Sequence, residues 1–187
     1  VQDYINPDLD RLGVKFDTMY SETKPDIQKV LNRLNEAGLS KQKDGAVWLD
    51  GAKAGLKQDE VLVRSYDNEY TYFLKDIAYQ LERLEERGFD STITIVGPDH
   101  HGQAIRLINA LKVLGHHGFS EISTQTIRLI KDGKEFKMSK RKGNYILLSD
   151  FLDTVPTEAA RFYFAMRDTN THMDFDIDLV KDHSAKN

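Results

Sequence analysis

The sequence predicts an α/β protein, in which helices pack on a parallel β-sheet and a small mixed module of one helix and short strands precedes them. Two observations favour the sheet. The apolar run Thr92–Val96 is followed by a polar turn and an apolar-faced helix over residues 103–114, and a further strand is expected over residues 125–130. Strand, turn, helix and strand in this order form a βαβ unit, whose strands are parallel.

The first third of the chain carries the pattern of the mixed module. A helix expected over residues 25–37 has one apolar face and ends at Gly38, a residue type that suits a helix exit. The strands expected in this module comprise residues 46–49, 60–65 and 70–74. The tripeptide Asp67-Asn68-Glu69 is expected to form the hairpin turn between the last two.

Residue patterns elsewhere in the chain predict one more helix, a turn and two helix N-caps. A helix is expected over residues 75–87, because apolar side chains recur there at helical spacing. Asp132-Gly133 is expected to form a turn. Ser149 and Thr157 are candidate N-caps of two later helices.

Composition places the chain among globular proteins and excludes several classes. Hydrophobic residues make up 40% and charged residues 30% of the 187 positions, with no apolar run approaching the roughly 18 residues of a membrane span. The absence of cysteine excludes disulfides and thiolate metal sites. The N-terminal residues lack the features of a signal peptide, so we expect a cytoplasmic protein with no membrane partner. The net charge of −4 argues against a chain that binds polyanions with its whole surface.

Basic residues are concentrated in residues 131–142, which contain six basic and two acidic residues. The six are Lys131, Lys134, Lys137, Lys140, Arg141 and Lys142. Met138 and Ser139 interrupt the charges, and Gly143 adds a flexible joint. A loop that lays ammonium groups on a triphosphate would stabilise the charge that grows on a leaving pyrophosphate. From residue types alone, phosphate binding and a solvated surface loop remain equally open.

A second unusual segment, Gly97-Pro98-Asp99-His100-His101-Gly102, follows the apolar strand. In an open α/β sheet, ligands bind at the carboxyl ends of the strands, and the N–H groups of the next helix attract anions. The triplet Asp99-His100-His101 also occurs in a family of metal-dependent phosphoesterases, but residues 1–89 contain no histidine for the further clusters that such enzymes need. A polar helix cap is the structural alternative, and for His101 it explains the residue as well as a function does.

A third segment places Tyr72 and Asp76 four residues apart, where the expected strand runs into the next helix. At that spacing the two side chains are expected to share one wall of a pocket. A half-buried tyrosine and an acid near a helix N-terminus explain the pair equally well on residue types alone.

Several strings along the chain resemble class I aminoacyl-tRNA synthetases. Lys137-Met138-Ser139-Lys140-Arg141 is similar to the second signature of that class, in which two lysines contact the ATP phosphates. The order of all the strings resembles the arginyl-tRNA synthetases over nearly the whole chain. The further strings are Tyr20-Ser21-Glu22, Asp44-Gly45-Ala46, Thr71-Tyr72 with Asp76, Gly97 with Asp99 to Gly102, and Ala159-Ala160-Arg161-Phe162.

The resemblance implies roles for the matching residues. Lys137 and Lys140 are the expected catalytic pair. The expected ATP-binding residues are Lys137, Met138, Ser139, Lys140, Gly97, Asp99, His100 and His101. The expected arginine-binding residues are Glu22, Tyr72, Asp76 and His100. Two carboxylates suit a guanidinium, because they accept charge-assisted hydrogen bonds from its planar fork of donors.

The same resemblance implies a domain plan. Residues 71–150 would form the C-terminal half of a Rossmann-like class I nucleotide-binding fold with the Lys-Met-Ser-Lys loop. Residues 1–70 would be an inserted connective module, and residues 151–187 a helical stretch leading toward an anticodon-binding domain. The first signature of the class, of HIGH type, is absent, and Gly115-His116-His117-Gly118 does not replace it because that string follows a helix.

We therefore expect a fragment that is inactive alone and belongs to a longer parent. The parent would use ATP with Mg²⁺, L-arginine and tRNA(Arg), with no prosthetic group and no metal held by the protein. Three alternatives remain: a class I synthetase for another amino acid, a metal phosphoesterase built on Asp99-His100-His101, and a non-catalytic paralogue that binds tRNA or protein. Glu22, Tyr72 and Asp76 argue against the first, because a pocket with two acids suits a cation. The phosphoesterase leaves the lysine-rich loop unexplained.

Overall fold

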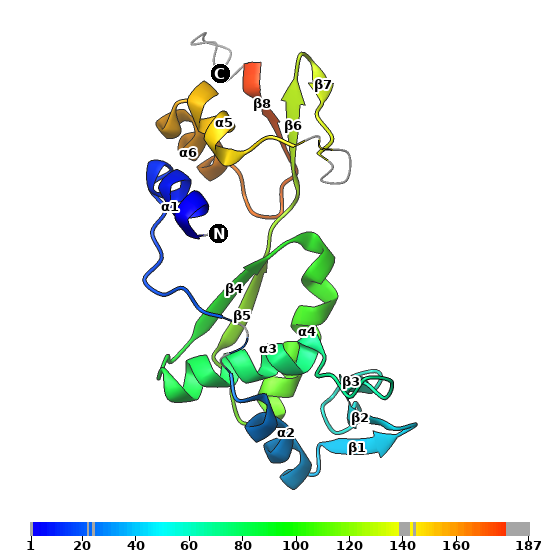
Figure 1. Cartoon of the computed structure of the whole chain (residues 1–187). Helices are drawn as coiled ribbons and strands as arrows, with labels where there is room; N and C mark the ends of the chain where they lie inside the picture. Colours follow the sequence, from blue (N-terminus) through cyan, green and yellow to red (C-terminus); the bar gives the residue numbers. More distant parts are fainter. Residues whose placement is uncertain (1, 22, 24, 139–142, 144, 179–187) are drawn as a thin grey trace. The chain divides into compact units, whose positions relative to one another are not determined.

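The computed structural model describes residues 2–21, 23, 25–138, 143 and 145–178 (Figure 1). These residues form two compact units, each with its own hydrophobic core. One unit is Tyr20–Ser123, and the other comprises the described parts of residues 1–19 and 124–187. The predicted α/β class is confirmed, because each unit combines helices with a parallel strand pair. The domain plan with boundaries at residues 70 and 150 stays a prediction.

The unit Tyr20–Ser123 begins with a helix and a three-stranded antiparallel sheet. The helix, α2 (Ile27–Glu36), starts at Asp26, whose side chain accepts a hydrogen bond from Lys29 N at 3.0 Å. The strands are β1 (Ser40–Lys43), β2 (Ala46–Leu49) and β3 (Glu60–Val63), paired in that order. The expected helix and the first two expected strands are therefore confirmed, and β1 is an addition to them.

The third expected strand, residues 70–74, is wrong beyond its first residue. Tyr70 forms a single antiparallel bridge with β3, but α3 (Tyr72–Leu81) begins two residues later. Thr71 caps this helix, because its hydroxyl accepts from Leu74 N at 3.4 Å and donates to a β3 carbonyl at 2.8 Å. A side chain that satisfies a helix N–H group in this way ends the strand and starts the helix.

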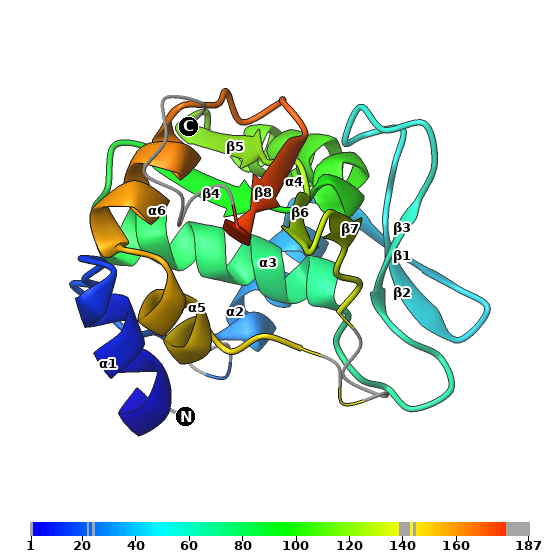
Figure 2. The same ribbon diagram turned by 90° about the horizontal axis from the view of Figure 1, so that it is seen from above.

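The second part of this unit contains the βαβ arrangement. After α3 come a π-helical turn (Glu82–Glu86), β4 (Thr92–Val96), a 3₁₀ turn η2 (Pro98–His100), α4 (His101–Val113) and β5 (Phe119–Ser123). Strands β4 and β5 are parallel, with Thr92 opposite Phe119 and Val96 opposite Ser123. In Figures 1 and 2, α3 and α4 both lie next to this strand pair.

The strand expected at residues 125–130 is present as β6 (Ile127–Lys131), but its predicted role as the second strand of the βαβ unit is wrong. That role belongs to β5, which follows the Gly115–Gly118 string. A Cβ on Gly118 would overlap the carbonyl oxygen of Asp90, so glycine allows the chain to enter β5 beside β4. Gly115 ends α4 with a φ of 90°, a value that glycine adopts without strain. The string is thus a structural turn.

The two faces of β4 have different surroundings. Thr92 is buried, and its hydroxyl donates to Gln80 Oε1 on α3 at 3.1 Å. Gln80 is itself only 3% exposed, so a polar contact fills the helix–sheet interface. On the opposite face of the strand, Ile93 and Ile95 are 55% and 68% exposed.

The core of this unit joins both of its parts. Leucines and isoleucine from the antiparallel sheet, α2, α3 and α4 pack in one cluster. The side chains with no measurable exposure are Leu34, Leu49, Leu62, Leu74, Ile77, Ala110 and Leu111. The mixed module and the α3–β5 segment therefore share one hydrophobic core.

The other unit is built around a third sheet. Its elements are α1 (Gln2–Arg11), β6, β7 (Lys134–Glu135), α5 (Leu148–Thr154), α6 (Thr157–Ala165) and β8 (Met173–Asp176). The strand order is β7-β6-β8, with β6 and β8 parallel. Phe175 is fully buried and packs on Phe151 and Tyr163 at centroid distances of 5.1 and 4.8 Å. This aromatic cluster holds α5 and α6 on the sheet.

The second unit tests two predictions from the sequence, a turn and a pair of helix N-caps. The Asp132-Gly133 turn is confirmed, with φ values of 51° and 69° between β6 and β7. The N-cap assignments of Ser149 and Thr157 are wrong, because both residues lie inside the first turn of their helices and neither helix has a side-chain cap. Within the described ranges, no helix is long and apolar enough to cross a membrane.

Candidate functional site

A pocket of about 190 Å³ lies on α3 where Tyr72 and Asp76 were expected to share a wall. Both residues are on this helix, one turn apart, so their side chains emerge on the same face. Tyr72 is 72% exposed and Asp76 is half-buried. The other lining residues are Tyr20, Pro25, Lys75 and Tyr79. Three aromatic rings and a carboxylate thus surround the pocket.

The aromatic wall is ordered by contacts among its own members. The rings of Tyr20 and Tyr79 lie 5.1 Å apart between centroids. Burial, reinforced by a hydrogen bond to Glu82, raises the pKa of Tyr20 to about 12, so the phenol stays neutral at physiological pH. Lys75 Nζ lies 5.3 Å from the centre of the Tyr72 ring. The pocket therefore offers aromatic faces of the kind that attract cations, next to a carboxylate.

Asp76 is also in contact with the helix that follows the Gly97–Gly102 segment. The side-chain amide of Gln103 on α4 donates to Asp76 Oδ2. Sequence reasoning missed Gln103, Tyr20 and Tyr79. Tyr79 could have been found, because it follows Asp76 by three residues on the same helix face. Tyr20 lies two residues before Glu22, in a string that carried the resemblance, so it could also have been found. Gln103 reaches Asp76 from α4, and nothing in the local sequence signals this contact.

The Gly97–Gly102 segment forms the expected strand-end turn. After β4 ends, His100 N donates to Gly97 O at 3.1 Å, and α4 begins at the next residue. Asp99 and His100 are exposed, and His100 makes no side-chain cap hydrogen bond. The polar-cap explanation therefore does not hold for His100. Among the described residues, no group of three histidine or acidic side chains could hold a metal ion.

The lysine-rich loop is described only in part. Ser139, Lys140 and Glu22 lie outside the described residues, so their predicted roles stay predictions. Lys137 follows the β6–β7 hairpin with its side chain 81% exposed, and its Nζ lies 3.8 Å from Glu135 Oε2. Met138 is 56% exposed. Lys137 is thus an accessible cation at the end of a hairpin, in the unit that does not contain Tyr72 and Asp76.

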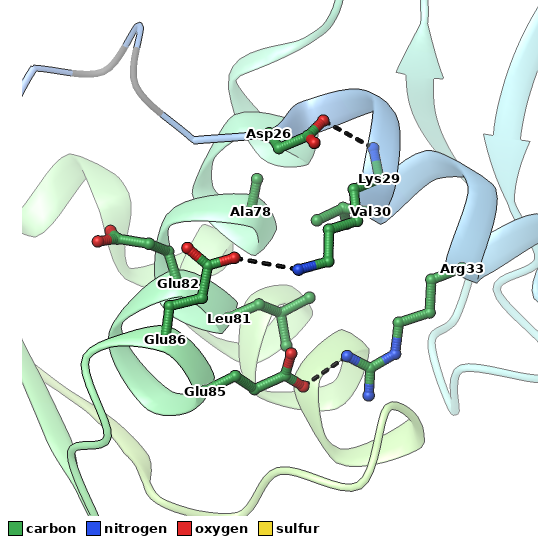
Figure 3. Close-up of a pocket in the computed structure, with 9 residues that line it drawn as sticks. All are labelled: Asp26, Lys29, Val30, Arg33, Ala78, Leu81, Glu82, Glu85 and Glu86. Atoms are coloured by element: carbon green, nitrogen blue, oxygen red, sulfur yellow. Dashed lines mark hydrogen bonds and ion pairs between the residues drawn. The ribbon is translucent and has the colours of Figure 1, made fainter.

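A smaller pocket between α2 and the π-helical turn is structural (Figure 3). Lys29 Nζ lies 3.1 Å from Glu86 Oε1, and Arg33 Nη1 lies 2.5 Å from Glu85 Oε1. His116 Nε2 also lies 2.6 Å from Glu85 Oε1. Burial would raise the pKa of Glu85, but the hydrogen bonds from Arg33 and His116 lower it below its usual value. The pocket is small, about 30 Å³, and cationic and acidic side chains in its lining pair with one another, so it is a helix-packing site.

Comparison with known proteins gives one consistent family. Residues 1–177 match the family model described as tRNA synthetases class I (R), catalytic domain. The chain is 43% identical over 181 residues to the arginine–tRNA ligase of Symbiobacterium thermophilum and 41% identical over 189 residues to that of Bacillus subtilis. These matches cover 94% and 98% of the chain, but only 32% and 34% of the relatives. The chain thus spans about a third of the length of the curated relatives it matches.

Solved structures agree with this result. A Campylobacter jejuni protein assigned as an arginyl-tRNA synthetase has a TM-score of 0.84 and 32% identity, with 96% of the chain and 40% of that protein covered. The Thermus thermophilus arginyl-tRNA synthetase has a TM-score of 0.74 at 16% identity, with 96% and 41% covered. The second match supports the fold alone.

Proposed function

The chain belongs to the class I tRNA synthetase family of the arginine type, through its catalytic domain, and from this membership we propose that it is part of an arginine–tRNA ligase. The longer parent enzyme joins L-arginine to tRNA(Arg) at the expense of ATP. In the first step the arginine carboxylate attacks the α-phosphate of ATP, arginyl-adenylate forms and pyrophosphate leaves. In the second, a terminal hydroxyl of the tRNA attacks the adenylate carbonyl and AMP leaves.

The observation that carries this proposal is the pocket on α3. Arginine has a planar guanidinium that is charged at every physiological pH. Such a group suits a pocket in which the carboxylate of Asp76 lies beside the ring of Tyr72, because the carboxylate accepts its N–H groups and the aromatic face attracts its charge. Glu22 is proposed as the second carboxylate, on the basis of the resemblance alone.

The phosphate end of the reaction is assigned to the lysine-rich loop. Lys137 is exposed enough to reach a triphosphate, and we assign Lys140 the same role from its place in the signature. Two ammonium groups on the leaving pyrophosphate stabilise charge that grows only as the reaction proceeds. Asp99, His100 and His101 are proposed to meet the adenylate at the start of α4, where unpaired backbone N–H groups favour an anion.

The reaction needs no covalent intermediate on the protein. The residues act by positioning the two substrates and by stabilising charge. We propose Mg²⁺ as the ion that accompanies ATP, a cytoplasmic location, and no prosthetic group.

A charging assay tests the function. The full-length parent is incubated with ATP, total tRNA and one amino acid at a time, including arginine, lysine and citrulline. We expect arginine alone to be attached, because citrulline keeps the shape of arginine but loses its charge. Charging of another amino acid would overturn the pocket assignment, and charging of none would favour a non-catalytic paralogue. The 187-residue chain alone is expected to show no arginine-dependent turnover.

A further inference from the structure

The carboxylate of Asp76 is held from outside its own helix. The amide nitrogen Nε2 of Gln103 donates a hydrogen bond to Asp76 Oδ2. Asp76 is on α3 and Gln103 is on α4, and both side chains are half-buried. Both helices belong to the unit Tyr20–Ser123, so the contact lies within one compact body. It is the point where α4 reaches the pocket wall.

We propose that Gln103 is a positioning residue for the arginine site, which orients the Asp76 carboxylate toward the guanidinium. The proposal rests on the proposed function, because it requires Asp76 to bind arginine. An aspartate side chain can rotate, and a fixed donor on one oxygen restricts that rotation. A carboxylate has about four acceptor sites on its two oxygens. The amide of Gln103 and a guanidinium can therefore bind the same carboxylate together.

The absence of charge on this donor is important. Two other carboxylates of the chain are oriented by cations. Arg106 Nη1 lies 2.8 Å from Glu60 Oε2, and Arg128 Nε lies 2.6 Å from Asp174 Oδ1. A cation offsets the charge of the carboxylate that it orients, whereas the amide of Gln103 adds no positive charge of its own. A pocket for a permanently charged guanidinium needs that charge, so glutamine suits the position better than lysine or arginine.

Helix α4, which carries the Gln103 donor, is anchored by a buried face. The residue after Gln103, Ala104, is 5% exposed, and Leu107 and Leu111 further along the helix are 5% and 0% exposed. A donor on a helix with a buried face keeps its geometry better than one on a loop. Gln103 also lies in the first turn of α4, directly after the Gly97–Gly102 segment. The start of α4 therefore holds the Asp76 carboxylate, which is proposed to bind arginine, and also the segment proposed to meet the adenylate.

The first test removes the donor and keeps the length of the side chain. In the full-length parent, Gln103→Met is compared with the wild type by initial rates of tRNA charging, with arginine varied and then with ATP varied. We expect KM for arginine to rise about tenfold, because a hydrogen bond to a charged group is lost, and KM for ATP to change less than about twofold. Asn109→Leu is the matched control, because it removes an amide donor from the same helix that contacts Gly55 O at 3.3 Å and not the pocket. It should leave both KM values unchanged.

A double-mutant cycle separates positioning from a general structural effect. If Gln103 acts through Asp76, then Gln103→Met changes KM for arginine in the wild type and adds nothing in the Asp76→Ala background. An equal effect in both backgrounds would overturn the proposal. A merely structural role would lower the maximal rate in proportion to the loss of folded protein and would leave both KM values unchanged.

A third variant keeps the proposal testable if Gln103→Met does not fold. Gln103→Lys retains a donor to Asp76 but adds a positive charge, so it should raise KM for arginine more than tenfold by competing with the substrate. A wild-type KM in Gln103→Lys would overturn the argument from charge. If the wild-type parent charges arginine and Gln103→Met has the same KM values as the wild type, only the proposed role of Gln103 is overturned. A wild-type parent that does not charge arginine overturns the proposed function and this inference together.

Discussion

Replacing Gly118 by alanine should destabilise the unit formed by residues 20–123. The backbone of Gly118 lies against Asp90 and Ser91, at the point where β5 enters beside β4. An added Cβ would lie closer to the Asp90 carbonyl oxygen than the van der Waals contact distance allows, and 3.3 Å from Ser91 Cα. These neighbours are backbone atoms, so they cannot rotate away as a flexible side chain would. The start of β5 must move instead.

The size of the effect follows from what that movement disturbs. Thr92 N donates to Gly118 O at 2.7 Å, and this bond begins the parallel ladder. Overpacking at a well-packed site costs about 2 kcal/mol. For a unit of about 100 residues, that cost lowers the midpoint of thermal unfolding by about 8 °C.

The chain contains a single tryptophan, Trp48, which reports on this unit. Its indole Nε1 donates to Lys43 O at 3.1 Å on the β1–β2 hairpin, so unfolding of that sheet changes its surroundings. Thermal unfolding of the 187-residue chain, followed by tryptophan fluorescence, therefore measures the stability of residues 20–123. Circular dichroism on the same samples adds the contribution of the other unit.

Gly102→Ala is the matched control. A Cβ on Gly102 meets no heavy atom within 4 Å, and the residue lies in the first turn of α4. Alanine is the better helix former by about 1 kcal/mol, so the midpoint should stay the same or rise. Equal midpoints for Gly118→Ala and the wild type would refute the steric argument, and an equal fall in both variants would show that any added methyl group is harmful here.

Three further outcomes are expected. Asp76→Asn in the full-length parent should raise KM for arginine at least tenfold and reduce the preference for arginine over citrulline, because the carboxylate charge is lost; charging kinetics with both amino acids measure this. Lys137→Ala should lower kcat for activation more than it weakens arginine binding, because its ammonium group acts on the leaving pyrophosphate; activation rates with the arginine concentration varied measure both quantities. The pKa of Glu85 is lowered from 4.5 by Arg33 and His116 against the effect of burial. Its stabilising contribution is therefore present above pH 4.5 and is lost as the pH falls through the lower folded pKa. Denaturation followed by Trp48 fluorescence at a series of pH values, from pH 7 down through the acid range below 4.5, should show this loss, and Glu85→Gln should reduce it.

Each of these outcomes has a contrary result. An unchanged arginine-to-citrulline preference in Asp76→Asn would remove this carboxylate from guanidinium recognition. Equal losses in kcat and arginine affinity for Lys137→Ala would count against a leaving-group role. The same pH dependence in Glu85→Gln and the wild type would show that other groups govern acid unfolding.

The sequence was most informative where a pattern depends on neighbours along the chain. The apolar run Thr92–Val96 and the periodic face of α4 both predicted their elements. The α3 start was missed because Thr71-Tyr72-Phe73-Leu74 has the β-branched and aromatic composition of a strand. Capping by Thr71 overrides that preference. The cap is recognised only in the structure, where the Thr71 hydroxyl accepts a hydrogen bond from the helix and donates one to β3.

Contacts across the fold explain what remained hidden. Strand β5, Phe-Ser-Glu-Ile-Ser, was missed because it alternates polar and apolar residues instead of forming the apolar run typical of a buried parallel strand. In the candidate site, Tyr72 and Asp76 could be placed together because their spacing fits one helix face. Gln103 is 27 residues away from Asp76 in sequence, so only the packing of α4 on α3 reveals that they meet.

The exposed isoleucines of β4 have a consequence for how the chain behaves in solution. Ile93 and Ile95 place two β-branched side chains on one open strand face, 55% and 68% accessible. Apolar surface of this kind favours association by about 25 cal/mol for each Å² removed from water. Purified chains are therefore expected to self-associate as concentration rises, with a sedimentation coefficient that increases accordingly. Ile95→Thr, which keeps the β-branched shape of the strand residue, should shift that association to higher concentration.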